Sequence, residues 1–369
     1  MAPPGARIVL FPWPEMTVRT SHSLSEFEAS GAPPEARTAR CTYLLPIWRL
    51  RADAAETAEF AAYFDELRDV GCEVLVIDGS PAPVFAEHAR AWRGRCRHLT
   101  VDARYPYLNG KVNGIHTGID LAGHERVIIA DDDIRYTAAD VERMCALLDR
   151  HECVRPQNYL APRPWWARME ASRMLINRGV LRAGDYPGTQ GVRRSAMRRV
   201  GHYDGDVLFD NEELVRHFAA CGADVGYARD FFIAKRPPTF AKWVEQRPRQ
   251  AYEDFGIPAK TALFLGLLPA VLALAGLGGA AVALAFCALV AVVAVTLAWR
   301  GRSGGAAAFV PASIALWAPA WVLERALSTW WAVYRRVRHG GCPFGGQLLS
   351  KGVGRDWSAG ARAARQRAA

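Results

Sequence analysis

Apolar runs and amphipathic segments alternate along the chain between residues 41 and 130. Short apolar runs bounded by polar or turn-forming residues predict four β-strands: 42–46, 73–78, 97–101 and 126–130. The intervening segments carry apolar residues at helical spacing and predict three α-helices: 54–70, 82–92 and 111–122. Strands that alternate with helices in this way are typical of a mostly parallel, helix-covered sheet. The pattern predicts an α/β fold that begins near Cys41.

The first 40 residues differ in composition from this region. They are rich in Pro, Ser, Glu and Arg and hold only a short apolar patch, from Ile8 to Phe11. This composition favours a loosely ordered leader over a folded domain. The N-terminus has no basic segment followed by an apolar core, so we expect no cleavable signal and a cytoplasmic location for the soluble part.

A long uncharged stretch follows the α/β region, from Thr261 to Trp299. Its 39 residues would form a helix of roughly 58 Å, about twice the ~30 Å thickness of the hydrocarbon layer. Three glycines, Gly276, Gly278 and Gly279, lie near its middle. We therefore predict a membrane hairpin with spans at about 261–276 and 280–299. A buried helix pair in a soluble protein is the alternative interpretation.

A third apolar stretch covers residues 303–323 and contains two prolines, Pro311 and Pro319. It continues into a segment with Trp330, Trp331 and Tyr334, and such aromatic residues favour the membrane interface. Residues 303–334 could form a third transmembrane helix or an interfacial helix. Two crossings plus an interfacial helix would keep the basic C-terminus cytoplasmic, whereas three would not.

The charge of the chain is concentrated at its C-terminus. The chain has 46 Lys and Arg against 37 Asp and Glu, a formal net charge of +9. From Arg335 onward there are eight basic residues and one acid, so this segment supplies seven of the nine excess charges. A basic segment beside apolar helices favours contact with anionic lipid over nucleic acid, although it could simply be solvated. We predict a basic tail over residues 335–369 and no nucleic-acid partner.

Eight cysteines are spread along the chain without any C-x-x-C pair. This spacing indicates neither a zinc ribbon nor a dense disulfide framework. Reduced thiols in a cytosolic domain fit it best.

Acidic residues follow two of the predicted strands, where ligands bind in helix-covered parallel sheets. Asp78 ends the second predicted strand, and Asp131, Asp132 and Asp133 follow the last one. Carboxylates at such positions can hold a divalent cation, which in turn neutralises a diphosphate. Each group could instead be an ordinary turn or helix cap.

Three later segments add candidate chemistry. Gly188 and Gly191 lie where a backbone could approach a ligand, shortly before a pair of arginines. The segment from Leu208 to Leu214 places acids at the head of a helix, where they could cap it or act as a general base. Gln246 to Gln250, with two arginines, lies shortly before the first predicted span.

The order of these parts resembles the family 2 glycosyltransferases with a GT-A fold, in the membrane branch that includes ceramide glucosyltransferases and the cellulose and hyaluronan synthases. The resemblance covers about residues 41–255. Four landmarks carry it: Asp78, the acids Asp131 to Asp133, the acids Asp210 to Glu213, and the Gln-x-x-Arg of Gln246 and Arg249. It implies a Rossmann-like mixed sheet over residues 41–258, followed by a membrane region over 259–334.

The resemblance also implies roles for individual residues. Asp210, Glu212 or Glu213 would act as the catalytic base, and Asp131 and Asp133 would bind Mg²⁺ or Mn²⁺. The remaining implied contacts are to the nucleotide or donor sugar, with a UDP-sugar expected: Asp78, Lys111, Asp131, Asp132, Gly188, Gln246, Arg247 and Arg249.

The chain departs from the family pattern at two positions. Asp210-Asn211 stands where the family commonly has Glu-Asp, which leaves open which acid is the base. Gln250 stands where the family commonly has Trp, so an aromatic residue associated with holding the acceptor is missing there. This second departure disfavours processive polymer synthesis.

These observations predict an inverting, metal-dependent glycosyltransferase that transfers a sugar to a lipid or lipid-linked acceptor. We expect a multi-pass protein of the cell membrane with a cytoplasmic catalytic domain. Three alternatives remain open: a non-catalytic scaffold, a processive polysaccharide synthase and a metal-dependent nucleotidyltransferase, which would release pyrophosphate instead of nucleoside diphosphate.

Overall fold

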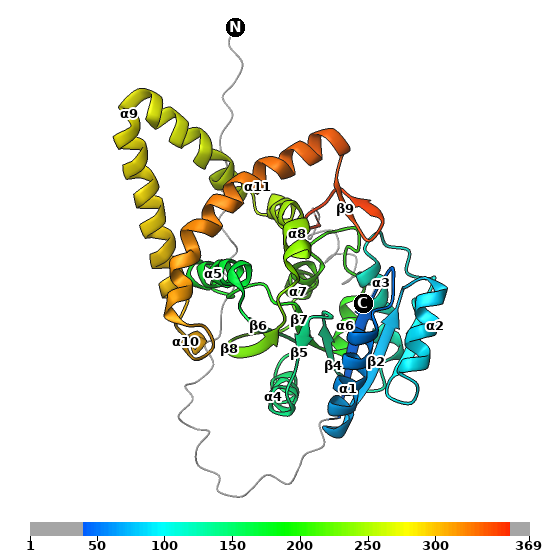
Figure 1. The fold of residues 1–369 in the computed structure, drawn as a ribbon. Helices are drawn as coiled ribbons and strands as arrows, with labels where there is room; N and C mark the ends of the chain where they lie inside the picture. Colours follow the sequence, from blue (N-terminus) through cyan, green and yellow to red (C-terminus); the bar gives the residue numbers. More distant parts are fainter. Residues whose placement is uncertain (1–39, 355–369) are drawn as a thin grey trace, which may run out of the picture. The chain divides into compact units, whose positions relative to one another are not determined.

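A computed structural model describes residues 40–354 of the chain. Nearly all of the predicted leader and the last fifteen residues of the predicted tail lie outside the described residues. The described part contains a mixed sheet with helices on both faces and a mainly helical region C-terminal to it (Figure 1).

The central sheet has eight strands in the order β3-β2-β1-β4-β7-β6-β8-β5. The strands are β1 (Cys41–Ile47), β2 (Cys72–Asp78), β3 (Arg97–Thr100), β4 (Arg126–Ala130), β5 (Ile134–Arg135), β6 (Cys153–Leu160), β7 (Thr189–Arg193) and β8 (Val225–Lys235). The four predicted strands are confirmed and pair in parallel as β3-β2-β1-β4. The remainder is mixed: β7 is antiparallel to β4 and β6, β8 is parallel to β6, and β5 is antiparallel to β8.

Eight helices accompany this sheet: α1 (Ala54–Asp69), α2 (Ala82–Ala91), α3 (Gly110–Leu121), α4 (Ala138–Leu148), α5 (Trp165–Val180), α6 (Arg194–Val200), α7 (Asp210–Ala220) and α8 (Phe240–Glu253). The three predicted helices are confirmed as α1, α2 and α3. Local capping explains several starts. The Asp53 side chain accepts a hydrogen bond from the backbone of Glu56, and Thr137 forms a capping box with Asp140.

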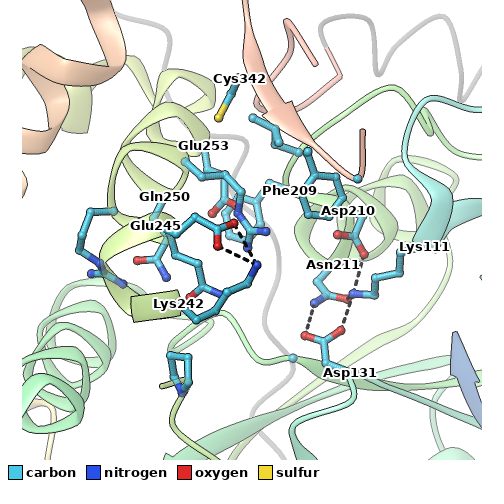
Figure 2. A pocket seen from close by; sticks show the side chains of 18 of the residues that line it. Lys111, Asp131, Phe209, Asp210, Asn211, Lys242, Glu245, Gln250, Glu253 and Cys342 are labelled. Carbon is cyan, nitrogen blue, oxygen red and sulfur yellow. Dashed lines mark hydrogen bonds and ion pairs between the residues drawn. The ribbon is translucent and has the colours of Figure 1, made fainter. Parts of the chain in front are cut away.

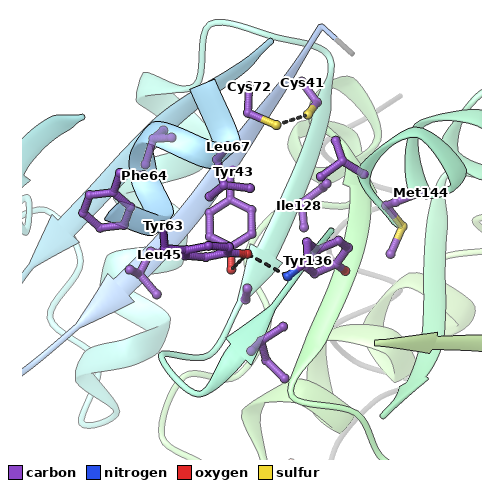
Figure 3. Packing of buried hydrophobic residues seen from close by; sticks show 14 of the residues in the cluster. Cys41, Tyr43, Leu45, Tyr63, Phe64, Leu67, Cys72, Ile128, Tyr136 and Met144 are labelled. Atoms are coloured by element: carbon purple, nitrogen blue, oxygen red, sulfur yellow. Dashed lines mark hydrogen bonds between the residues drawn. The ribbon is translucent and has the colours of Figure 1, made fainter. Parts of the chain in front are cut away.

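Strand β1 is buried on both faces because its residues alternate between two apolar cores. Tyr43 and Leu45 face the core that includes α1 and α4, whereas Leu44 faces the core that includes α3, α6 and α7. In the first core the ring of Tyr43 meets the rings of Tyr63 and Tyr136 edge to face (Figure 3). The hydroxyl of Tyr63 also accepts a hydrogen bond from the backbone of Tyr136 at 2.7 Å.

Helix α9 (Pro258–Arg300) contains the long uncharged stretch. Gly279 has non-helical dihedral angles, φ 78° and ψ 173°, and divides α9 into two arms that meet at a bend (Figure 1). Each arm is about 21 residues long, or roughly 32 Å, which matches a hydrocarbon layer. The bend predicted at the glycines is confirmed. Within residues 40–354, α9 is the one helix long and apolar enough to cross a membrane.

The predicted third stretch forms α10 (Ala306–Phe309), a 3₁₀ helix (Ala312–Trp317) and α11 (Ala318–His339). Helix α11 packs one face against α5, α8 and α9. Its other face exposes a row of apolar side chains: Leu323, Leu327, Trp330, Trp331, Tyr334 and Val337. This two-sided character favours the interfacial helix over a third crossing.

The residues after α11 return to the α/β domain. Strands β9 (Cys342–Phe344) and β10 (Gln347–Leu349) form an antiparallel hairpin. Beyond it, the carbonyls of Lys351 and Gly352 accept hydrogen bonds from the backbones of Leu208 and Phe209, both at 3.0 Å. The basic tail predicted for 335–369 is described only as far as Gly354. Its described part consists of the end of α11 and a hairpin held by specific contacts.

Candidate active site

A cavity of about 1650 Å³ lies at the carboxyl ends of β1, β4 and β8 and is bounded by α8, α11 and the β9–β10 hairpin. Nine of the predicted site residues line it: Lys111, Asp131, Asp132, Asp133, Gly188, Asp210, Gln246, Arg247 and Arg249. They come from widely separated parts of the sequence, so the fold brings them together. Three other predicted residues, Asp78, Glu212 and Glu213, are not among its lining residues.

One side of the cavity holds a network centred on Lys111 (Figure 2). The Lys111 Nζ lies 2.5 Å from Asp131 Oδ1, 2.7 Å from Asp210 Oδ2 and 2.9 Å from Asn211 Oδ1. Burial opposes the charge on Lys111, but the two carboxylates outweigh it and raise the Lys111 pKa. The same lysine therefore joins the end of β4 to the start of α7.

The acidic motif continues at Asp133, which pairs with Lys235 at the end of β8. Lys235 Nζ lies 3.1 Å from Asp133 Oδ2. Burial raises the pKa of Asp133 to about 6; Lys235 opposes this shift, while Asp131 and Asp132 add to it. The other carboxylate oxygen, Asp133 Oδ1, is buried and has no hydrogen-bond partner. Partly buried carboxylates that repel one another, with an unused oxygen among them, fit a divalent cation.

The donor set at this motif suits a cation that is shared with a phosphate ligand. Asp131 and Asp133 supply two carboxylates, and Mg²⁺ commonly uses one or two carboxylates plus substrate phosphates and water. Gly188 borders the same space: a Cβ there would lie 2.6 Å from Asp131 Oδ2 and 2.8 Å from Lys235 Nζ. Any larger residue would require the Asp131 and Lys235 side chains to shift.

Asp78 lies behind the cavity wall, and its neighbour Gly79 lines the cavity in its place. The Asp78 Oδ2 atom lies 2.7 Å from His88 Nδ1 and 3.0 Å from His98 Nε2. Burial opposes ionisation of Asp78, but hydrogen bonds from His88, His98 and Ser80 outweigh it and lower the pKa. Among the described residues, Asp78, His88 and His98 form the one group with three candidate metal-ligand atoms close together. Direct contact of this carboxylate with a nucleotide stays a prediction.

The acids at the start of α7 have different surroundings. Glu212 pairs with Arg155 and with Arg216, each at 2.7 Å. Glu213 accepts a hydrogen bond from the backbone of Gly354 at 2.8 Å. Burial raises the Glu213 pKa, and this backbone hydrogen bond opposes the shift. Of the three acids predicted as the base, Asp210 is the one that lines the cavity.

Helix α8 supplies the opposite side of the cavity. Arg247 donates to Glu170 at 3.0 Å and stacks on the ring of Trp243, so protein groups hold much of its side chain. Arg249 Nε is buried without a hydrogen-bond partner, and Glu253 Oε1 is 3.4 Å away. Arg249 is therefore better placed than Arg247 to receive an anionic ligand. Gln246 also lines the cavity.

Several lining residues were not predicted from the sequence. Arg49 pairs with Asp132 at 2.6 Å, and Lys235 pairs with Asp133. Burial raises the pKa of Glu253 to about 7, with Arg249 opposing the shift. Lys235 ends a strand, so the rule that ligands bind at carboxyl ends could have identified it once β8 was recognised.

The side chain of Gln250, where the family pattern commonly has Trp, has a structural partner. Its Oε1 accepts a hydrogen bond from Arg325 Nη2 at 3.2 Å. Arg325 belongs to α11 and also pairs with Asp254 at 3.1 Å. Gln250 therefore helps to hold α11 against α8.

No protein-family model and no curated protein matches the chain. Among solved structures, it is similar to a mannosyltransferase from Pyrobaculum calidifontis in complex with GDP-Man and Mn²⁺. That match has 18% identity and a TM-score of 0.45, and covers 79% of this chain and 87% of the other. Glucosyl-3-phosphoglycerate synthase from Mycobacterium tuberculosis, in complex with Mn²⁺ and UDP-Glc, matches at 16% identity with a TM-score of 0.39. It covers 59% of this chain and 80% of the other. Similarity at this level does not establish a family or an activity.

Proposed function

We propose that the protein is a metal-dependent, inverting glycosyltransferase that moves a sugar from a nucleoside diphosphate sugar to a lipid or lipid-linked acceptor. One observation carries the proposal: Asp131, Asp133, Asp210 and Arg249 line the same cavity at the carboxyl ends of the strands. Carboxylates for a cation, an arginine for a diphosphate and a carboxylate base are the groups that such a transfer needs.

Asp210 is the proposed base. Its carboxylate would take the proton of an acceptor hydroxyl while that oxygen forms a bond to the anomeric carbon and the bond to the diphosphate breaks. Lys111 holds the Asp210 carboxylate at 2.7 Å, at the N-terminus of α7. No covalent sugar intermediate is required.

The leaving diphosphate would lie between the acidic motif and α8. A Mg²⁺ or Mn²⁺ ion held by Asp131 and Asp133 would supply Lewis-acid neutralisation of the diphosphate charge. Arg249 would donate to its oxygens from the other side, because a guanidinium can bind two phosphate oxygens at once. A UDP-sugar is the expected donor.

The acceptor side of the cavity supports a lipid. Three lining residues, Val244, Leu327 and Trp331, are each about half exposed and belong to α8 and to the apolar face of α11. An amphiphile could keep its apolar part against this face while its headgroup reaches the charged interior. The two arms of α9 would cross the cell membrane, with the catalytic domain and the basic residues near Arg300 in the cytoplasm.

The non-catalytic alternative rests on the departures at Asn211 and Gln250. Both side chains have contacts that explain them: Asn211 accepts from Lys111, and Gln250 accepts from Arg325. Neither departure removes the carboxylate at Asp210. These contacts favour an enzyme over a scaffold.

The experiment is to incubate membranes containing the protein with a panel of nucleotide sugars and total lipid extract, followed by mass spectrometry. We expect a lipid heavier by one sugar and one released nucleoside diphosphate per transfer. Pyrophosphate release would indicate the nucleotidyltransferase instead, and products with many sugars would indicate a processive synthase. Absence of turnover with every donor would contradict the proposal.

A further inference from the structure

The β9–β10 hairpin forms part of the cavity wall although it follows the membrane region in sequence. Six consecutive residues, from Cys342 to Gln347, line the cavity. The turn uses Gly345 and Gly346, with φ of 56° and 80°. Two positive φ angles in a row make a tight turn that glycines accept without strain.

The chain beyond the hairpin is attached to both sides of the cavity. On the α8 side, the hydroxyl of Tyr252 donates to the carbonyl of Ser350 at 3.0 Å. On the α7 side, Leu208 and Phe209 donate to the carbonyls of Lys351 and Gly352. These bonds fix the hairpin relative to the arginine on α8 and to the segment that precedes Asp210.

Phe344 at the end of β9 contacts Arg249 directly. The guanidinium carbon of Arg249 lies 4.9 Å from the centre of the Phe344 ring. This is a cation–π distance. Nε of Arg249 makes no hydrogen bond but forms an ion pair with Glu253 Oε1 at 3.4 Å. The Phe344 ring and the Glu253 carboxylate therefore both orient this arginine, and they leave its Nη groups for a ligand.

We infer that Phe344 is a positioning residue of the diphosphate site: by stacking on Arg249 it aims the guanidinium at the diphosphate of a nucleoside diphosphate. This inference rests on the proposed function. A guanidinium held flat against a ring keeps its N–H edge free for bidentate contact with phosphate oxygens. The C-terminal hairpin thereby contributes to binding of the donor, and Phe344 is needed even though it lies about 95 residues from Arg249 in sequence.

The test measures UDP affinity by isothermal titration calorimetry of the full-length protein in detergent with Mn²⁺. Phe344→Leu keeps an apolar side chain beside Leu208, Tyr252 and Cys342 but removes the ring. We expect UDP affinity to fall by roughly 3- to 30-fold, the range of a cation–π contact, and Phe344→Trp to restore it. Leu348→Ala is the matched control, because Leu348 lies on the same hairpin, is half exposed and does not line the cavity.

A double-mutant cycle separates positioning from general damage. Because Phe344 acts through Arg249, Phe344→Leu should cause no further loss of UDP affinity in an Arg249→Ala background. If Phe344→Leu lowered UDP affinity equally in the wild-type and Arg249→Ala backgrounds, the inference would be overturned. So would unchanged UDP affinity in Phe344→Leu when Arg249→Ala weakens binding. If the wild type binds neither UDP nor GDP with Mn²⁺, the proposed function itself fails, and the inference with it.

Discussion

At the scale of single residues, the surroundings of each acid decide which one can act on a substrate. Glu212 is held by two arginines and Glu213 by the backbone of Gly354, whereas Asp210 lines the cavity beside Lys111. Adjacent positions on one helical turn thus have distinct environments. Asp210, the one of the three that lines the cavity, is therefore the acid that we propose as the base.

Asp210→Asn should lower kcat by roughly 10²- to 10⁴-fold, because the amide cannot accept the acceptor's proton. UDP affinity should stay near the wild-type value, since Asp210 is not a diphosphate contact. Glu213→Gln is the matched control and should retain most of the turnover. Steady-state kinetics with titration of UDP would check this. Retained turnover in Asp210→Asn together with lost turnover in Glu213→Gln would assign the base to Glu213.

Mn²⁺ binding should depend on pH because the pKa of Asp133 is raised to about 6. Above pH 7 the carboxylate is ionised and Mn²⁺ affinity should be flat. Below pH 6 protons compete for the same oxygens, so affinity should fall by up to about tenfold per pH unit. Electron paramagnetic resonance titrations of free Mn²⁺ between pH 5 and 8 would measure it. Unchanged affinity down to pH 5 would contradict the raised pKa or the metal role.

At the scale of elements, the bend in α9 depends on one glycine. Gly279 has φ 78° and ψ 173°, a conformation that is essentially restricted to glycine and costs other L-residues roughly 1–3 kcal/mol. Gly276 lies three residues earlier, has no such φ, and a Cβ there would meet nothing within 4 Å. The two glycines therefore form a natural pair for comparison.

Gly279→Ala should lower the stability of the protein in detergent by about 1–3 kcal/mol, whereas Gly276→Ala should leave it unchanged or raise it by up to about 1 kcal/mol. The difference arises because alanine favours a continuous helix and disfavours the left-handed conformation. Thermal unfolding of both variants would show it. Equal effects would mean that the bend does not require the left-handed backbone at Gly279.

The elements that could be predicted from sequence are those with local signals. From β1 to α3, apolar strand segments alternate clearly with amphipathic helical segments. The acids Asp131 to Asp133 and Asp210 stand at the ends of elements, where their spacing alone identifies them. Lys235 also ends a strand, but it can be identified only once β8 is recognised, and no such rule identifies Phe344. Lys235 reaches the acidic motif because β8 is parallel to β6 and antiparallel to β5, and Phe344 reaches Arg249 because the chain folds back after α11. Long-range pairing leaves no periodic pattern in the sequence.

At the scale of the whole described region, α9 is firmly joined to the α/β domain. Gly179 on α5 and Gly301 at the end of α9 allow close approach: a Cβ on Gly179 would lie 2.2 Å from the carbonyl oxygen of Leu297. Arg178 also donates to the carbonyl oxygens of Gly301 and Ser303, at 3.1 and 2.9 Å. If α9 enters the bilayer, these contacts hold the cavity near its surface.

The proposed membrane hairpin predicts a specific labelling pattern. Leu277 is 91% exposed beside the bend, whereas Ser303 follows the second arm. In a background with the exposed Cys287 changed to Ser, Leu277→Cys should react with an impermeant maleimide on intact cells. Ser303→Cys should react only in inverted vesicles. Labelling of both positions from the cytoplasmic side would show that α9 does not cross the membrane.

The most direct test of the account is the coupling between Mn²⁺ and UDP binding, measured by titrating UDP with and without Mn²⁺. If Asp131 and Asp133 hold a cation that contacts the diphosphate, UDP should bind at least about tenfold more tightly with Mn²⁺. Asp133→Asn should remove this difference, whereas Arg249→Ala should weaken UDP binding in both conditions. Equal UDP affinity with and without Mn²⁺ in the wild type would contradict the central claim.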